Sequence, residues 1–403
     1  MDESLQQLRI CLVAYMISRQ ATGLSTYVAD LVTHLLDEGH QVTVLATDCG
    51  YRGTKGGELP TIDSRASTLV FPVRGRANRK LYHSSALSKW LSVHIREFDL
   101  VDIQGIWAFV NIDAARIAIK AGVPYVITPH GMMTRWDWSK RKLFKRILYR
   151  FKIKNIWTRA ATIRFLSEGE FANSAVPVEC PYVVIPNAVA PFNGAFVDKM
   201  SVCASNGIPV ENHIILFLGR ICRQKGALDL LQAFELLFGN RTDVSLLMVG
   251  PAEKGEYTDQ LTNFVAQSPA KANIHLPGPT FGDEKYSLYR AADVFVTLSR
   301  NEGLSIAALE SLAEGLPVLL TADSNLPDVQ EFDAGVVTVC EPVAVAAALM
   351  RLLEDNERLF AMKANALRLH RERFSWPVVL PQLTNLYRTL ARCHRGSGDV
   401  ETR

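Results

Sequence analysis

HIILFLGRICRQKGALDLLQAFELLFGNRTDVSLLMVG, residues 213–250, decides the fold class. The runs 213–219 and 244–250 are short and apolar, as expected of buried strands. Between them, residues 227–238 carry apolar side chains at helical spacing. A helix that joins two buried strands predicts a parallel βαβ unit, and therefore an α/β protein.

The same alternation of apolar runs and helical patterns extends along most of the chain. Before this unit it predicts strands at 10–15, 41–47, 101–105 and 125–130, a helix at 25–38, and closing segments at 164–170 and 182–187. After it come strands at 273–278, 294–299 and 317–322. The irregular stretch 188–212 is interpreted as a linker. Two successive α/β halves predict two Rossmann-like domains, 1–190 and 191–376, that face a cleft.

The composition is that of a globular protein. The chain has 403 residues, of which 48% are hydrophobic and 21% charged, and a formal net charge of +3. This balance predicts no nucleic-acid partner. The seven cysteines include no Cys-x-x-Cys pair, which argues against disulfides and structural zinc. The polar N-terminus, and the lack of an apolar run of about 18 residues, predict a cytoplasmic protein.

Three common nucleotide-binding motifs are absent from the sequence. The chain has no Gly-x-Gly-x-x-Gly fingerprint and no Gly-x4-Gly-Lys-[Ser/Thr] loop, which argues against nicotinamide chemistry and ordinary nucleotide hydrolysis. It also lacks an Asp-x-Asp pair, with which many sugar transferases hold a metal on the donor. A diphosphate would therefore need cationic side chains and a helix terminus.

The stretch SRNEGLSIAALESLAEGLPV, residues 299–318, supplies such a helix terminus. A helix is predicted to start near Ser305, whose hydroxyl can cap a backbone N–H group, and to end at Gly315. Glu302 then lies at the mouth of the helix and Glu310 lies about two turns in. The unpaired N–H groups of the first turn favour a phosphate group. The alternative is an amphipathic helix with acidic residues on its solvated face.

Three further side chains lie at the ends of predicted strands or just beyond them. Arg220 follows its strand directly and Lys225 lies in the next loop, so both could reach one diphosphate. Solvated loop cations are the alternative. His130 precedes Gly131 and could contact a sugar hydroxyl or support charge at a reacting carbon. A histidine bonded to the backbone is the alternative there.

Together these segments resemble the retaining glycosyltransferases of family 4, which have the GT-B fold. The resemblance rests on Glu302-x7-Glu310 and on the Gly-Arg-x4-Lys-Gly pattern of residues 219–226. Gly23 stands in the segment that is similar to the family's Gly-rich loop, with Thr-Gly in place of Gly-Gly. The other departures are Ala188 in IPNAV, Asp328 in LPDVQ, and Gly-Leu-Ser at 303–305 in place of Gly-Phe-Gly.

The resemblance implies a role for each of these residues. Arg220 and Lys225 would bind the donor diphosphate, and Glu310 would bind the donor ribose. Glu302, near the reacting centre, and His130, in the sugar pocket, are the two predicted catalytic residues. The remaining predicted donor-binding residues are Gly23, Gly303 and Leu304.

The resemblance also implies which components the reaction needs and how the chain ends. The enzyme would use no metal and no cofactor, and its donor would be a UDP-sugar or GDP-sugar. A leaving phosphate oxygen would help to deprotonate the acceptor. GT-B transferases commonly return their last helix to the N-terminal domain, so helix 377–393 is predicted to pack there. Residues 394–403 are predicted to be disordered.

Residues 135–159, RWDWSKRKLFKRILYRFKIKNIWTR, form a basic segment with ten Lys or Arg and one acidic residue, Asp137. Aromatic residues are interleaved with the cations. This pattern predicts a surface helix on an anionic membrane, with Trp136 and Trp138 as interfacial anchors. The alternative is an ordinary helix whose aromatic residues pack on the core.

The predicted function is a retaining, metal-independent glycosyltransferase. It would move a sugar from a nucleoside diphosphate to a hydroxyl of a glycan or lipid-linked acceptor, in polysaccharide or glycoconjugate biosynthesis. Two alternatives stay open: a GT-B nucleotide-sugar epimerase or phosphorylase, and a non-catalytic membrane-associated scaffold that kept the fold. The predicted location is the cytoplasm, with peripheral attachment to the membrane face through 135–159.

Overall fold

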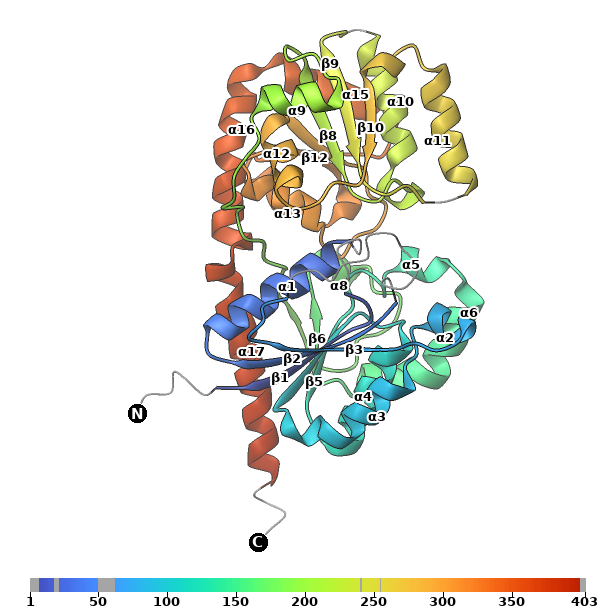
Figure 1. Cartoon of the computed structure of the whole chain (residues 1–403), viewed down its shortest axis with the longest axis vertical. Helices are drawn as coiled ribbons and strands as arrows, with labels where there is room; N and C mark the ends of the chain where they lie inside the picture. The colour runs from blue at the N-terminus through green and yellow to red at the C-terminus, as the bar shows by residue number, and fades with distance from the viewer. Residues whose placement is uncertain (1–6, 18–21, 50–61, 240, 254, 399–403) are drawn as a thin grey trace. The chain divides into compact units, whose positions relative to one another are not determined.

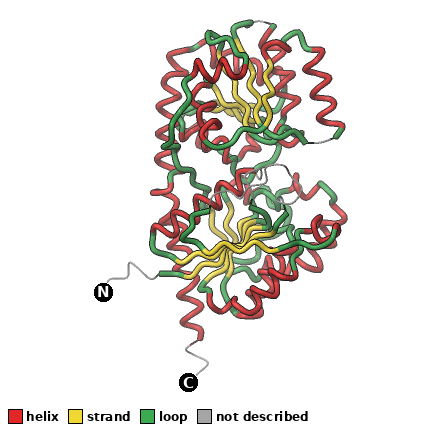
Figure 2. Tube along the Cα trace, viewed as in Figure 1, coloured by secondary structure: helices red, strands yellow, loops and turns green. Residues whose placement is uncertain are grey.

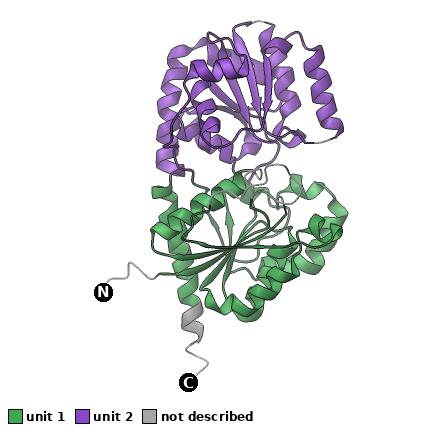
Figure 3. Ribbon diagram, viewed as in Figure 1, with its two compact units in different colours: residues 1–188, 376–403 green, residues 189–375 purple. Residues whose placement is uncertain are grey.

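The computed structural model describes residues 7–17, 22–49, 62–239, 241–253 and 255–398. The chain divides into two compact units, which are residues 1–188 with 376–403 and residues 189–375 (Figure 3). Each unit is built on its own parallel sheet, with helices around it (Figure 2). The predicted α/β class is therefore confirmed.

Unit 1 contains a seven-stranded sheet in the order β3-β2-β1-β4-β5-β6-β7 (Figure 1). Its strands are β1 Arg9–Ala14, β2 Gln41–Thr47, β3 Ser67–Phe71, β4 Leu100–Gln104, β5 Tyr125–Thr128, β6 Thr162–Phe165 and β7 Tyr182–Val184. The strand order reverses between β1 and β4, as in a Rossmann domain. In such sheets, ligands bind beyond the carboxyl ends of the strands near the reversal.

Helices cover both faces of this sheet. They are α1 Thr22–Asp37, α2 Arg76–Leu81, α3 Ser85–His94, α4 Phe109–Ala121, α5 Arg135–Ser139, α6 Lys142–Leu148, α7 Lys154–Thr158, α8 Glu168–Ala172 and α17 Trp376–Gly398. One face, with Val13, Ile103 and Ile127, packs on α3, α4 and α7 in an apolar core. The other face lies against α17, because Tyr387 of that helix donates a hydrogen bond to Asp102 in β4.

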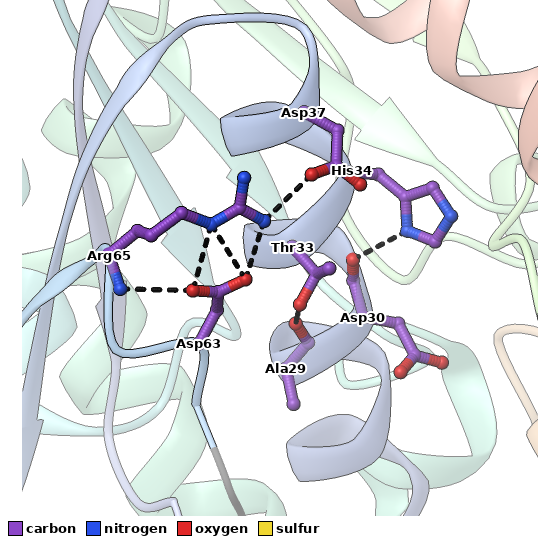
Figure 4. Close-up of polar contacts among 7 residues, drawn as sticks. All are labelled: Ala29, Asp30, Thr33, His34, Asp37, Asp63 and Arg65. Atoms are coloured by element: carbon purple, nitrogen blue, oxygen red, sulfur yellow. Dashed lines mark hydrogen bonds and ion pairs between the residues drawn. The ribbon is translucent and has the colours of Figure 1, made fainter.

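The C-terminal half of α1 is tied to its surroundings by polar contacts that Figure 4 shows. Arg65 bonds to Asp37 at 2.7 Å and to Asp63 at 2.6 Å, so the segment before β3 is fastened to the helix end. His34 Nδ1 lies 2.8 Å from the Asp30 carbonyl oxygen, and its ring stacks on Trp376 at 4.3 Å. These contacts join α1, α17 and the sheet within unit 1.

Unit 2 contains a six-stranded sheet in the order β10-β9-β8-β11-β12-β13, again of Rossmann type. Its strands are β8 His213–Leu218, β9 Val244–Val249, β10 Ile274–Gly278, β11 Val294–Thr297, β12 Val318–Thr321 and β13 Gly335–Thr338. Its helices are α9 Lys199–Asn206, α10 Ala227–Phe238, α11 Glu256–Gln267, α12 Asp283–Ala291, α13 Ile306–Ala313, α14 Asp328–Glu331, α15 Pro342–Glu354 and α16 Asn356–Leu369. An apolar core of strand and α10 residues fixes this arrangement.

Several local predictions differ from the structure. The stretch 188–212 contains helix α9, which Asp198 caps by accepting a hydrogen bond from Ser201 N. Segment 164–170 is not one element, since β6 ends at Phe165 and Ser167 caps α8. The last helix begins one residue earlier than predicted and continues to Gly398, so residues 394–398 are helical. No helix-breaking proline interrupts that stretch.

Candidate functional site

Two of the predicted site residues in unit 2 are in direct contact. Lys225 ends a short 3-10 turn, Arg223–Lys225, and its Nζ forms an ion pair with Oε1 of Glu302. The same carboxylate oxygen accepts a hydrogen bond from Ser299 Oγ at 2.8 Å. Both charged side chains are mostly buried, at 15% and 14% exposure. The Lys225 cation is therefore neutralised by the Glu302 carboxylate.

The loops that carry these two residues are fastened to each other. Arg300 N donates to the Gln224 carbonyl at 2.8 Å, and Gln224 Nε2 donates to the Asn301 carbonyl at 2.9 Å. The Arg300 guanidinium makes a bidentate pair with Asp229 at 2.8 and 2.9 Å. A Cβ at Gly226 would collide with the Leu298 carbonyl, so only glycine permits this close approach.

A third loop, after β12, supports Glu302 from its backbone. Glu302 N donates to the Asp323 carbonyl at 3.2 Å, and Asn325 Nδ2 donates to the Glu302 carbonyl at 2.6 Å. Asn325 has a left-handed backbone with φ of 56°, which asparagine tolerates better than most residues. Loops after β8, β11 and β12 therefore meet at the carboxyl edge of the sheet, where α/β folds bind ligands.

Helix α13 starts where the sequence predicts, but its cap is different. Ser305 is the N-cap residue, yet its hydroxyl makes no capping hydrogen bond. Instead, Ser305 Oγ is one of the buried side-chain atoms without a partner in the described part of the chain. Gly303 and Leu304, predicted to bind donor, precede it and are buried. The first turn of α13 thus lacks a side-chain cap, and its N–H groups are free of competition from that hydroxyl.

Glu310 is almost fully buried, with 3% exposure, and both of its oxygens are engaged. Lys285 Nζ lies 2.6 Å from Oε1, and Tyr289 OH donates to Oε2 at 2.9 Å. Burial acts to lower the pKa of Lys285, but Glu310 and Tyr286 together outweigh it and the net shift of the pKa is upward. Burial and the same carboxylate raise the pKa of Tyr289 well above its usual value. Sequence analysis missed both partners, whose only signal is their four-residue spacing on one face of α12.

Arg220 stands apart from this cluster. It lies just beyond β8 and is exposed, with no ion pair or hydrogen bond to another residue of the described ranges. The backbone next to Arg220 is closely packed: Gly250 lies so near Gly219 that a Cβ atom at position 250 would collide with the Gly219 carbonyl oxygen. Arg220 therefore differs from Lys225: no acidic side chain of the described residues compensates its charge.

His130 lies in unit 1, two residues beyond β5. It adopts a left-handed backbone with φ of 52°, and Gly131 follows with φ of 75°. The buried Glu170 holds this turn, since it accepts hydrogen bonds from Gly131 N and, at 2.7 Å, from Leu166 N. Burial raises the pKa of Glu170 to about 7, against the opposing effect of these two N–H groups. Glu170 was not found in the sequence, because nothing in the sequence links it to a turn 39 residues away.

The imidazole of His130 belongs to a buried polar network. Its Nε2 lies 2.7 Å from Gln104 Oε1, and Gln104 Nε2 donates to Asp102 Oδ2 at 2.8 Å. The hydroxyl of Tyr387 in α17 donates to the same Asp102 oxygen at 2.7 Å. Burial, followed by the charge of Arg164, lowers the pKa of His130 to about 3, so the ring is neutral at physiological pH.

Arg164 is fully buried and binds the segment that is similar to the family's I-P-N-G-V motif. It donates to the carbonyls of Ile185 at 3.0 Å and Pro186 at 2.6 Å, and to Asn187 Oδ1 at 3.2 Å. It also donates to Tyr27 OH in α1. The motif is therefore a set of acceptors for one buried cation, which the sequence alone did not indicate.

Three further predicted features concern Gly23, metal binding and membrane spans. Gly23 lies in the first turn of α1 and is half-buried, whereas residues 18–21 of the predicted Gly-rich loop lie outside the described residues. Among the described residues, no group of three or more His, Cys, Asp or Glu could hold a metal ion. Within the same ranges, no helix has the length and apolar character that a membrane span requires.

The basic segment is several short elements rather than one helix. It comprises α5, α6, a π-helical turn at Tyr149–Ile153, and α7. The predicted anchor Trp138 packs on the rings of Trp107 and Tyr149, at 5.6 and 5.4 Å, so it is partly buried against the core. Trp136 is half-buried with Lys140 Nζ 3.6 Å above its ring. Four other apolar side chains are exposed instead: Leu143 73%, Phe144 49%, Ile147 52% and Phe151 75%.

Comparison with known proteins gives a consistent family assignment. The profile "Glycosyl transferases group 1" matches residues 201–368, and "Glycosyltransferase Family 4" matches residues 21–191. A D-inositol 3-phosphate glycosyltransferase from Corynebacterium glutamicum is 32% identical over 186 residues, which cover 45% of this chain and 44% of that protein. The chain thus matches less than half of that relative's length.

Two further similarities extend over nearly the whole chain. An uncharacterized glycosyltransferase from Methanocaldococcus jannaschii is 28% identical over 386 residues, 91% of this chain and 94% of that protein. The structure of Anabaena HepE in complex with UDP-glucose has a TM-score of 0.74 at 17% identity, and the match covers 95% of this chain and all of that one. The two Rossmann-type units therefore have the GT-B fold. The chain belongs to glycosyltransferase family 4, within the group 1 transferases.

Proposed function

We propose that this protein transfers a sugar from a nucleoside diphosphate to an acceptor hydroxyl with retention of configuration and without a metal ion. The observation that carries the proposal is the contact between Lys225 and Glu302 at the carboxyl edge of the unit 2 sheet. It places a cation for phosphate beside a carboxylate, next to the uncapped start of α13. The family membership supports a sugar-transfer chemistry for this arrangement.

The contacts suggest a separate task for each group. Arg220, which has no counter-ion among the described residues, and Lys225 would bind the diphosphate and stabilise the leaving nucleotide. Glu310 would accept hydrogen bonds from the ribose while Lys285 and Tyr289 hold its carboxylate in position. Glu302, once Lys225 turns to phosphate, would be free to contact the donor sugar. His130 of unit 1 would contact the sugar as the family resemblance implies.

The donor class follows from relatives and the acceptor class from the resemblance. HepE is described in complex with UDP-glucose, which supports a UDP-sugar or GDP-sugar here. The acceptor would be a hydroxyl of a glycan or of a lipid-linked carrier, in cytoplasmic polysaccharide or glycoconjugate biosynthesis. The match to inositol phosphate transferases covers too little of their length to carry their acceptor over.

The test begins with binding and proceeds to product analysis. Thermal stabilisation by a panel of UDP-sugars and GDP-sugars identifies the donor, because a ligand of the native state raises the melting temperature. Mass and NMR analysis of products, with and without acceptor and with chelator, then follows. Transfer with retained anomeric configuration in chelator supports the proposal. Donor isomerisation without acceptor would identify an epimerase, and binding without turnover would identify a scaffold.

We further propose that the protein attaches to anionic membrane through a defined patch, the α6 patch. Its apolar members are Leu143, Phe144, Ile147 and Phe151, and its exposed cations are Arg141, Lys142, Arg146 and Arg150. Residues 143, 147 and 151 are spaced like one face of a helix, so they can enter an interface together. Each cation near an anionic surface contributes about 1 kcal/mol. A lipid-linked acceptor would then lie near the enzyme.

Liposome co-sedimentation tests the patch with matched charge. One variant changes Arg141, Lys142, Arg146 and Arg150 to Gln. The control changes four exposed cations elsewhere in unit 1, Lys89, Arg96, Arg116 and Lys120, to Gln. Lys145 is left intact because it pairs with Asp137 inside the segment. The proposal is supported if binding requires anionic lipid and is lost in the α6-patch variant but kept in the control variant. Equal loss in both variants, or no binding by the wild type, would exclude the patch.

A further inference from the structure

The buried network behind His130 fixes the orientation of the Gln104 side chain. Asp102 is 1% exposed, and its Oδ2 accepts hydrogen bonds from Tyr387 OH and from Gln104 Nε2. Because Asp102 Oδ2 acts as the acceptor for both groups, the amide nitrogen of Gln104 faces Asp102. Burial raises the pKa of Asp102, and the hydrogen bonds from Tyr387 and Gln104, with the charge of the fully buried Arg164 on the same face of the sheet, oppose that shift. The Gln104 carbonyl oxygen then faces the other way, toward His130.

This orientation determines where the imidazole carries its proton. Gln104 Oε1 is an acceptor and lies 2.7 Å from His130 Nε2, so Nε2 must carry the hydrogen. The ring is neutral, because burial and Arg164 lower its pKa to about 3. A neutral imidazole has one N–H group, and Nδ1 is therefore a bare lone pair.

The lone pair of Nδ1 is available to a ligand. In the part of the chain that the structure describes, Nδ1 has no hydrogen-bond partner, and it is not among the buried unpaired atoms. It therefore reaches the surface of unit 1. The ring cannot turn away easily, since Tyr27 contacts it edge-on at 6.1 Å and Glu170 holds the turn at Gly131.

We propose that Gln104 is a positioning residue that locks His130 as the Nε2–H tautomer, so that Nδ1 accepts a hydrogen bond from a hydroxyl of the donor sugar. This inference rests on the proposed function. An acceptor that cannot gain a proton attracts O–H groups and repels a carboxylate. The geometry thus selects a neutral, hydroxylated sugar over a sugar acid that carries a carboxylate at the same position.

The first experiment reads the tautomer directly in the ligand-free protein. The chain has nine histidines, so a His130→Ala variant assigns the signals, and ¹⁵N chemical shifts distinguish N–H from bare ring nitrogens. Wild type should show protonated Nε2 and bare Nδ1. Gln104→Met should abolish this single state, whereas Tyr387→Phe, which removes the other hydrogen bond to Asp102, should preserve it. A protonated Nδ1 in wild type, or unchanged shifts in Gln104→Met, would overturn the proposal.

The second experiment measures sugar selectivity by calorimetry. The ligands are UDP, UDP-glucose and UDP-glucuronate. If bare GDP binds more tightly than UDP, they are GDP, GDP-mannose and GDP-mannuronate. Wild type and Tyr387→Phe should prefer the neutral sugar at least about tenfold, and Gln104→Met should reduce that preference to about threefold or less. Affinity for the bare nucleotide should not change. Equal preference in wild type, or no effect of Gln104→Met, would overturn the selectivity. Failure to bind any nucleotide sugar would overturn the selectivity and the proposed function together, while the tautomer result would stand by itself.

Discussion

The two units carry their functional residues in opposite ways. In unit 2, Arg220, Lys225 and Glu302 lie in loops and keep part of their surface, and Glu310 is the buried exception. In unit 1, Asp102 and Arg164 are buried at 1% and 0% exposure, and only the half-buried His130 reaches the surface. Unit 2 has charged side chains at its surface, whereas unit 1 uses buried charges to hold the neutral imidazole of His130 in place. Substitutions should therefore impair binding in unit 2 and stability in unit 1.

Arg164→Leu should have the largest effect, on stability. It leaves the acceptors at 185–187 and the Asp102 carboxylate without their cation, and breaking a buried charge network typically costs about 3–5 kcal/mol. The measurement is urea unfolding, with Arg9→Ala as the control. Arg9 pairs with Asp99 at 3.1 Å but is 48% exposed, so its loss should cost under about 1 kcal/mol. Comparable costs for the two variants would contradict the distinction between the units.

Arg220→Ala and Lys225→Ala should mainly affect turnover. Removing a charge-assisted contact to developing phosphate charge typically costs about 2–4 kcal/mol, so each should lower kcat/KM at least about tenfold. The two variants should differ in the free enzyme. Lys225→Ala releases Glu302 and should lower the melting temperature slightly, whereas Arg220 has no partner to lose in the described ranges. Near-normal kinetics in both variants would remove these residues from the site.

Glu170 should give unit 1 a pH-dependent stability. Its pKa is raised from 4.5 to about 7, so the native state holds the proton more tightly than the unfolded state. Its favourable contribution is fully present below about pH 4.5 and is lost as the pH rises through about 7. Between pH 5 and 8, the stability advantage of wild type over Glu170→Gln should shrink by on the order of 2 kcal/mol. A constant difference would mean that Glu170 is ionised throughout.

The contrast between the units also explains what the sequence could predict. The α/β class and most strands followed from apolar runs such as 213–219 and 244–250, because parallel buried strands are continuous in sequence. Glu302 and Glu310 were found because one loop and helix carry both. Lys285 and Glu170 were not found, because Lys285 contacts Glu310 and Glu170 contacts Gly131 only through tertiary packing. For Trp138 the sequence left membrane contact and packing on the core both open, and the structure has it partly buried beside Trp107.

The smallest effect on stability should come from Ser305→Ala. This variant tests whether the start of α13 is capped by Ser305 or binds phosphate. If Ser305 capped α13 as predicted from the sequence, its removal would cost about 1 kcal/mol. Its hydroxyl instead makes no capping bond and is buried without a partner among the described residues, so Ser305→Ala should change stability by less than about 0.5 kcal/mol. Nucleotide affinity should fall, because a diphosphate at the start of α13 would be the group that satisfies this hydroxyl. Thermal unfolding with and without UDP or GDP separates the two effects. A loss of stability in the free protein with unchanged nucleotide binding would restore the capping role and remove α13 from the phosphate site.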